Sequence, residues 1–296
     1  MRDWTHWDSH LHIDPLDSDR WADRLVENMA ANGVQMGAIS GVSMVTADQD
    51  DRVRRAVAKY PQRLLPMLCG VDLNDPSALG RAIAELETGR WAGVGELFLD
   101  TFQGMKMSFQ DGERTVVRHY PVPRDGAANA VLGGLLEYCT RHGLPLLLHC
   151  ETPAVLEELL RRHPHSMLLW AHCDYHTPRD EARRILRTHS WLHADFGPSI
   201  RCGYWDRQQG ASTWLDENIE FWRDMCRDFP DRLLLGTDTV GAKYADPPRY
   251  RHIYDSFADF FTPLEAEKAK KITEGNFRRL FDGYLRRAAA HPHPAA

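Results

Sequence analysis

The chain has 296 residues, of which 43% are hydrophobic and 26% charged, and its formal net charge at pH 7 is −6. This length and composition indicate a globular protein with a large core, built as one large α/β domain or as two smaller ones. No run of about 18 apolar residues is present, which excludes a membrane-spanning helix. The negative charge balance disfavours nucleic acid as the main partner.

The N-terminus and the cysteines fit a cytoplasmic protein. The first residues, Met1-Arg2-Asp3-Trp4, lack the apolar stretch of a signal peptide. The six cysteines form no C-x-x-C pair, so we expect reduced thiols that mostly fill the core.

Short apolar segments alternate with amphipathic segments along almost the whole chain. The apolar segments are typical of parallel strands that are covered on both faces. In chain order they are 7–13, 35–42, 63–71, 91–98, 144–150, 166–172, 190–196 and 232–237. The predicted helices between them are 19–32, 48–60, 76–88, 126–142, 153–163, 178–189 and 214–229, most of them followed by Gly, Pro or a polar stop.

Eight such units predict a closed (β/α)8 TIM barrel, because right-handed β-α-β crossovers close readily into one. A doubly wound open sheet would carry a glycine-rich phosphate-binding turn after its first strand, where His10-Leu11-His12 stands instead. We expect one domain over residues 1–286 and a flexible C-terminal tail at 287–296.

Three long connections, 99–125, 197–213 and 238–247, follow strands on the side where barrel enzymes build their sites. Cationic groups near a metal could hold a carboxylate or phosphate, and aromatic groups could pack against an organic substrate. The alternative for each residue is an ordinary solvated loop position. The candidate substrate contacts are Lys106, Arg201, Trp205 and Tyr244.

Six side chains suited to metal binding stand at or near the C-terminal ends of five predicted strands. His10 and His12 are two apart, so they point to the same face of a strand. Any member alone has a structural explanation, as a core histidine or a salt-bridge partner. Together they predict a metal site at the barrel mouth. The six are His10, His12, Glu96, His149, His172 and Asp238.

The ordered motifs over residues 7–283 resemble the amidohydrolase superfamily of metal-dependent barrel hydrolases, including its amidohydrolase-2 and TatD-like branches. The matching motifs are Asp8-Ser9-His10-Leu11-His12, Gly93-Val94-Gly95-Glu96, Leu148-His149-Cys150-Glu151, Ala171-His172-Cys173, Gly236-Thr237-Asp238 and the closing segment from Ile272 to Phe281.

The resemblance implies two divalent ions, with zinc favoured and manganese or iron as alternatives. His10, His12 and Asp238 would hold one ion, His149 and His172 the other, and Glu96 would bridge them. Many superfamily members carry a carboxylated lysine at the position of Glu96. A one-metal site, with His149 or His172 turned towards the substrate, also fits.

The resemblance implies a hydrolase that uses a metal-activated water to cleave an ester, lactone, amide or phosphoester of a small molecule. Asp238 would take the proton from the water and pass it to the leaving group, and His172 is a second catalytic candidate. The substrate could be anionic, and a homo-oligomer is compatible with the sequence.

Three alternatives to a small-molecule hydrolase stay open. A metal-dependent decarboxylase of the amidohydrolase-2 group would use His10, His12, His149 and Asp238. A TatD-like nuclease would share Glu96 and the histidines, although no basic tract with interleaved aromatics is present. A non-catalytic binding protein on a barrel without activity is the third.

Overall fold

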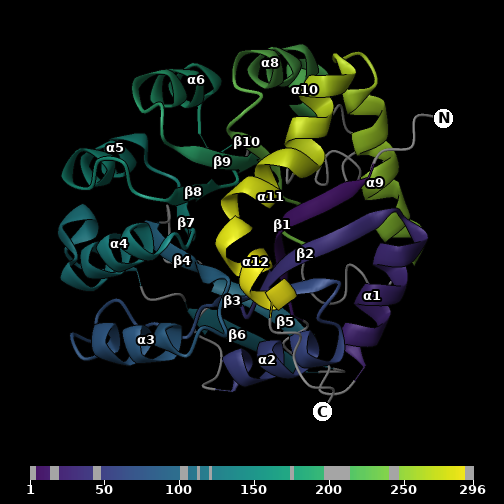
Figure 1. Ribbon diagram of the computed structural model, residues 1–296. Helices are drawn as coiled ribbons and strands as arrows, with labels where there is room; N and C mark the ends of the chain where they lie inside the picture. The colour runs from purple at the N-terminus through teal and green to yellow at the C-terminus, as the bar shows by residue number, and fades with distance from the viewer. Residues whose placement is uncertain are drawn as a thin grey trace.

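The computed structural model describes residues 5–13, 20–42, 48–100, 106–111, 114–119, 122–173, 177–196, 214–239 and 247–290, with backbone alone for 106–111, 114–119, 214–218 and 249. Eight parallel strands form one sheet in the order β1-β2-β3-β4-β7-β8-β9-β10, which confirms the predicted (β/α)8 barrel (Figure 1). The strands are β1 (His6–His12), β2 (Val34–Ser40), β3 (Leu64–Leu68), β4 (Gly93–Asp100), β7 (Leu146–Cys150), β8 (Leu168–Ala171), β9 (His193–Phe196) and β10 (Leu233–Leu235).

Helices surround the barrel because each has one apolar face. In α6, for example, the buried residues Ala182, Ile185 and Leu186 are three and four positions apart. The outer helices are α1 (Trp21–Ala31), α2 (Gln49–Lys59), α3 (Ala78–Glu87), α4 (Ala130–His142), α5 (Pro153–Arg162), α6 (Arg179–Thr188), α8 (Trp214–Asp228) and α9 (Pro247–Phe261). All but α9 were predicted, with ends that differ by a few residues.

The first and last strands meet at a seam that closes the barrel. Leu11 bridges to Thr239, and the Asp238 amide donates to the His10 carbonyl at 2.9 Å. The buried carboxylate of Asp8 accepts from both the amide and the hydroxyl of Thr237, at 3.1 and 2.7 Å. Residues more than two hundred positions apart therefore lie side by side at the mouth.

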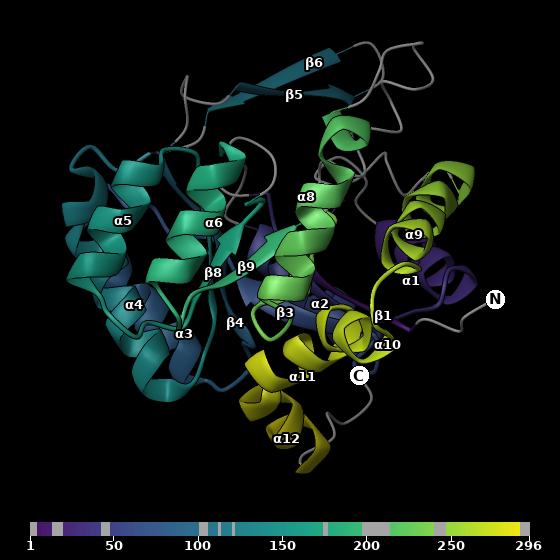
Figure 2. The ribbon, with the colours of Figure 1, turned by 90° about the horizontal axis from the view of Figure 1, so that it is seen from above.

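The N-terminal end of the barrel is covered by α11 (Asn276–Leu280) and α12 (Asp282–Ala290), on the side opposite to β5 and β6 (Figure 2). Phe277 contacts Trp7 of β1 with ring centroids 5.2 Å apart. The Asn276 amide donates to the carbonyls of Pro230 and Leu233, each at 2.7 Å. This floor therefore joins the first strand to the last. α10 (Ala266–Lys270) and a π turn at Lys271–Gly275 lead into it.

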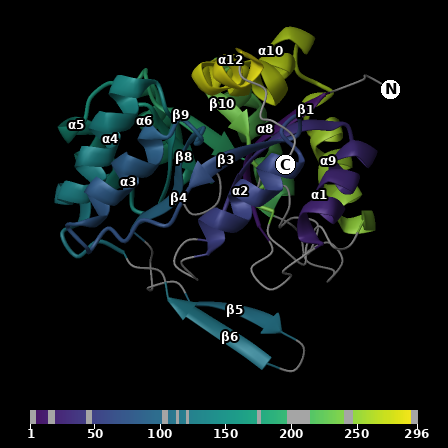
Figure 3. The same cartoon turned by 60° about the horizontal axis from the view of Figure 1, so that its bottom comes forward.

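The long connection after β4 contains an antiparallel hairpin that we did not predict, β5 (Lys106–Asp111) and β6 (Arg114–His119). Among the residues that the structure describes, its two strands pair only with each other. The ribbon stands apart from the barrel in two views (Figures 2 and 3). It leaves from the C-terminal end of β4 and therefore lies on the mouth side.

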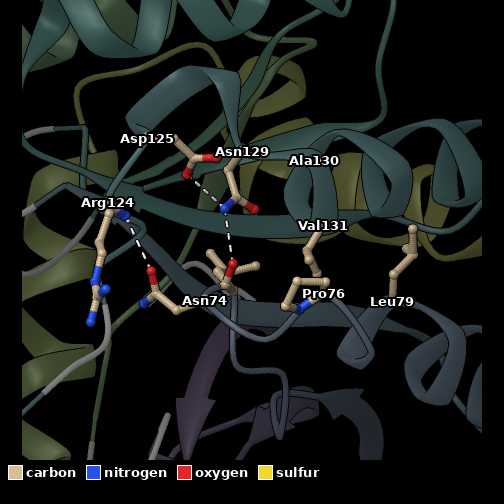
Figure 4. Close-up of a pocket in the computed structure, with 9 residues that line it drawn as sticks. Asn74, Pro76, Leu79, Arg124, Asp125, Asn129, Ala130 and Val131 are labelled. Carbon is tan, nitrogen blue, oxygen red and sulfur yellow. Dashed lines mark hydrogen bonds between the residues drawn. The ribbon is translucent and has the colours of Figure 1, made fainter.

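A pocket of about 360 Å³ lies where this connection returns to the barrel (Figure 4). The Asn129 amide group donates to the Leu73 carbonyl at 2.9 Å and to Asp125 Oδ1 at 2.8 Å. Its oxygen accepts from the Leu132 amide at 2.8 Å and caps α4. Because these polar groups hydrogen-bond to one another, we interpret the pocket as a structural contact where the connection joins the barrel. None of its lining residues is a candidate metal ligand.

The five cysteines within the described residues are buried, as expected for thiols that fill the core. Helix α12 runs to Ala290, beyond the predicted domain end at residue 286; the domain boundary itself stays a prediction. No helix among the described residues is long and apolar enough to cross a membrane.

Candidate metal centre

Glu96 on β4 lies between two groups of histidines at the barrel mouth. Its Oε2 atom is 3.4 Å from His10 Nε2 and 3.3 Å from His12 Nε2. Its Oε1 atom is 3.2 Å from His149 Nδ1 and 2.9 Å from His172 Nε2. Each carboxylate oxygen therefore faces a different pair of imidazoles.

Two glycines bring Glu96 to this position. A Cβ atom on Gly93 would lie 2.5 Å from the Pro145 carbonyl oxygen, and one on Gly95 would lie 2.3 Å from the Leu147 carbonyl oxygen. Gly95 also has a φ of +121°, a backbone angle that residues other than glycine rarely adopt. The spacing of the Gly-Val-Gly-Glu motif thus reflects the close approach of β4 to β7.

His10 and His12 present their Nε2 atoms to the centre, and these atoms are 3.1 Å apart. The Nδ1 atom of His10 contacts Asp195 Oδ2 at 3.1 Å, and that of His12 contacts the Gly41 carbonyl at 2.9 Å. Because these oxygens only accept, each Nδ1 carries a proton, and in the neutral ring that a metal requires the lone pair of Nε2 faces inward. Two such lone pairs repel unless a cation lies between them.

That spacing suits a metal ion. Two nitrogens bound tetrahedrally to zinc at about 2.0–2.1 Å would lie about 3.3 Å apart. Ligand atoms of His10, Glu96, His172 and Asp238 all lie within 4.8 Å of one another. The donor set of imidazoles and carboxylates therefore fits a divalent cation such as zinc, manganese or iron.

His149 and His172 face the other oxygen of Glu96. His149 directs Nδ1 to Glu96, while its Nε2 contacts Glu151 Oε1 at 2.9 Å. His172 directs Nε2 to Glu96, and its buried Nδ1 has no hydrogen-bond partner among the described residues. His149 is therefore anchored through its second nitrogen by a carboxylate, as His10 is.

Asp238 completes the cluster from the end of β10. Its Oδ1 atom is 3.3 Å from His12 Nε2 and 3.9 Å from His10 Nε2. Its side chain is 24% exposed, whereas that of Glu96 is 4% exposed. Asp238 and His172 both adopt left-handed backbone angles, φ +46° and +48°. Such angles in non-glycine residues concentrate at functional sites.

Burial and neighbouring opposite charges shift the pKa values of the cluster in opposite directions. Burial alone would raise the pKa of Glu96, but the charges of His10 and His172 hold this pKa well below its usual range. Burial alone would lower the pKa of His10, which Glu96 and Asp195 raise well above its usual value. The pKa of His149 is raised to about 9 against its burial by Glu151 and Glu96. The negative charge that attracts protons here also attracts a metal cation.

The six predicted ligands are thus brought together by the fold, while their role as ligands stays a prediction. Glu96 lies within β4 rather than at its end, because the strand continues to Asp100. Lys106 lies in β5, on the hairpin, and its side chain lies outside the description. Arg201, Trp205 and Tyr244 lie outside the described residues.

Two buried carboxylates at the site, Glu151 and Asp195, were not predicted. Glu151 is two positions after His149, so strand alternation alone could have placed both side chains on one face. Asp195 lies near the end of the predicted strand 190–196, where the same search for strand-end acids would have found it.

The comparisons with known proteins agree with this geometry. The sequence matches the family model described as Amidohydrolase over residues 7–283. The chain therefore belongs to the amidohydrolase family, whose enzymes are metal-dependent, and the resemblance seen in the sequence motifs is confirmed. A search of curated protein sequences found no significant match.

Several solved structures share the fold. One is 4-oxalomesaconate hydratase from Rhodopseudomonas palustris, at 17% identity over 97% of this chain and 98% of that chain, with a TM-score of 0.62. A second is 5-carboxyvanillate decarboxylase from Novosphingobium aromaticivorans with bound manganese, at 12% identity over 94% and 96%, TM-score 0.56. A third is a Xaa-Pro dipeptidase with bound methionine, at 11% identity over 95% and 76%, TM-score 0.58. At these identities the similarity establishes the fold alone. The three enzymes named catalyse different reactions.

Proposed function

We propose that the chain is a metal-dependent hydrolase that cleaves an ester, lactone, amide or phosphoester bond of a small molecule. The observation that carries the proposal is the position of Glu96, whose two oxygens face separate pairs of imidazoles. A carboxylate placed in this way can bridge two cations. Two-metal sites of this kind serve hydrolysis and related displacements.

The residues divide into two sets around Glu96. His10, His12 and Asp238 would hold one ion, and His149 and His172 the other, with zinc as the first candidate and manganese or iron as alternatives. A bound divalent ion would lower the pKa of water from 15.7 to about 7 and polarise a substrate oxygen.

Asp238 is the acid–base candidate of the site. It is the most exposed carboxylate of the cluster, at 24% against 4% for Glu96, so solvent and substrate can reach it. Its Oδ1 atom, 3.3 Å from His12 Nε2, is placed to accept a proton from water at the centre. Asp238 would then deliver this proton to the leaving group. His172, whose Nε2 atom lies 2.9 Å from Glu96 Oε1, borders the same space and is the second catalytic candidate.

A decarboxylase is the second candidate, and one observation favours it. The atoms of His10, Glu96, His172 and Asp238 are close enough to share a single ion. A one-metal site would leave Glu96 with no second ion to bridge, which would weaken the case for hydrolysis.

Elemental analysis of the purified protein, joined to product assays, tests the proposal. Two equivalents of metal per chain are expected, with an acid plus an alcohol or amine released from ester, lactone or amide substrates, or phosphate and an alcohol from phosphoesters. One equivalent, with CO₂ released from aromatic carboxylates, would favour the decarboxylase. A protein that binds no divalent metal would overturn both.

A further inference from the structure

Asp195 is a fully buried carboxylate that no proposed ligand role uses. It lies on β9, with 0% of its surface exposed. Its Oδ2 atom accepts from His10 Nδ1 at 3.1 Å, and its Oδ1 atom accepts from the backbone amide of His172 at 2.8 Å. One side chain therefore holds two candidate ligands from different strands.

We propose that Asp195 is a positioning residue that fixes the tautomer of His10 and the backbone of His172, and so prepares the centre for metal. This inference rests on the proposed metal centre and deepens it. Because a carboxylate only accepts hydrogen bonds, it keeps the proton of His10 on Nδ1. The lone pair of Nε2 is then left facing Glu96 and His12. Partners of this kind orient histidine ligands and raise their basicity.

The same carboxylate holds the strained position of His172. A backbone amide can only donate, so Oδ1 gives it a fixed acceptor while the residue keeps its φ of +48°. Gly236 makes room for this arrangement, since a Cβ atom there would lie 2.7 Å from both Cβ and Cγ of Asp195. The place of Asp195 is therefore set by packing as well as by hydrogen bonds.

An isosteric change at this position has an unusual consequence. In Asp195→Asn the amide oxygen has to accept from the His172 amide, so the NH₂ group faces His10 Nδ1. That nitrogen can then only accept, and the proton of the neutral ring moves to Nε2. The atom that faces the cation site would be blocked, although the shape of the side chain is preserved.

In Asp195→Ala both tautomers of His10 become available, because nothing dictates the state of Nδ1. Binding of a metal can then select the tautomer with a free Nε2. We therefore expect the isosteric variant to lose more metal affinity than the truncated one. A role in packing alone predicts the reverse order, since alanine leaves a cavity and asparagine does not.

The test measures Zn²⁺ affinity by competition with a chromophoric chelator, and thermal unfolding of the metal-free proteins. The expected loss of affinity is about 100-fold for Asp195→Asn and about 10-fold for Asp195→Ala, within the range for partners of metal-bound histidines. The metal-free Asn variant should unfold close to the wild-type temperature, and the Ala variant at a lower one.

Asp8→Asn is the matched control. Asp8 is also 0% exposed, but its Oδ2 atom accepts from the hydroxyls of Thr237 and Tyr254, both at 2.7 Å. Hydroxyls can turn and accept from an amide. No imidazole is forced to change tautomer, so Zn²⁺ affinity should stay near the wild-type value.

The outcomes separate the two proposals. If the wild-type protein binds no Zn²⁺, Mn²⁺ or Fe²⁺, the proposed function fails. If the wild type binds metal but Asp195→Asn binds it equally well, or better than Asp195→Ala, the role of Asp195 is refuted and the metal centre stands.

Discussion

Histidines lie at both ends of strand β1, and their pKa values are shifted in opposite directions at the two ends. At the mouth, Glu96 and Asp195 raise the pKa of His10 well above its ordinary value. At the floor, burial without an acid partner lowers the pKa of His6 to about 4. His6 and His10 both belong to β1. Strand β1 therefore carries an imidazole with a raised pKa at the mouth, beside Glu96 and Asp195, and one with a lowered pKa at the floor.

The largest expected effect comes from removing the acid that defines the mouth. Glu96→Gln would leave four imidazoles without the charge between them, and both proposed ions should be lost. Loss of several kcal/mol of charge stabilisation corresponds to a fall in turnover of about 10⁴-fold. Elemental analysis and turnover measurements check this, with exposed Glu87→Gln on α3 as the control. A variant that keeps both ions would show that Glu96 does not bridge them.

Asp238→Asn should separate proton transfer from metal binding. The amide keeps an oxygen near His12 but cannot take up a proton, so turnover should fall by about 10³-fold. The metal content should be largely retained. Parallel measurements of turnover and bound metal decide the matter, and unchanged turnover would contradict the role of Asp238.

The two halves of the mouth can be separated through His149. His149→Asn removes one of the imidazoles that face Glu96 Oε1, while His10, His12 and Asp238 keep their places around Oε2. One equivalent of metal should remain, with turnover lower by about 10²-fold because stabilisation of the developing charge is lost. Loss of both equivalents of metal would indicate that the two halves of the mouth bind their ions cooperatively.

The floor histidines should make the protein sensitive to acid. The unfolded chain binds a proton at His6 below its ordinary pKa of 6.5, whereas the folded protein excludes this proton until about pH 4. Stability is therefore full above pH 6.5 and falls by roughly 3 kcal/mol per such histidine as the pH drops to 4. The pKa of His193 is likewise lowered to about 4 by burial and by Arg279. Because its side chain is partly exposed, its contribution to the loss of stability is smaller.

Urea unfolding at pH 7 and pH 4.5 measures this loss. His6→Phe keeps an aromatic ring beside Tyr254, whose ring centroid is 5.3 Å from that of His6. The variant removes the titration, so the difference in stability between the two pH values should shrink. An unchanged difference would place the acid sensitivity elsewhere.

Most of the barrel could be predicted from sequence because each strand is a short apolar run followed by an amphipathic segment. The hairpin at 106–119 was missed, although Asp111-Gly112 is a known hairpin signal; its two segments are more polar than the apolar runs by which the barrel strands were predicted. Helix α9 was not predicted, although its buried residues Tyr250, Ile253, Tyr254 and Phe257 recur at helical spacing.

The ligand positions could be predicted because strand ends converge in a barrel. The pairing of nitrogens with carboxylates could not. Whether His10 turns Nδ1 or Nε2 inward depends on where Asp195 lies across the barrel, a tertiary contact between residues 185 positions apart. Glu151 lies only two positions from His149, yet its contact depends on the rotamers of both side chains.

The seam between β1 and β10 has a consequence for the order in which the protein forms. Asp8 and Thr237 are 229 positions apart, and Asn276 anchors the base of β10 from later still. During synthesis, β1 precedes its neighbour β10 by more than two hundred positions, so the seam can form only after all the intervening strands have been made. His10 and His12 are therefore made long before Asp238, and the proposed metal site can be completed only once β10 has joined β1.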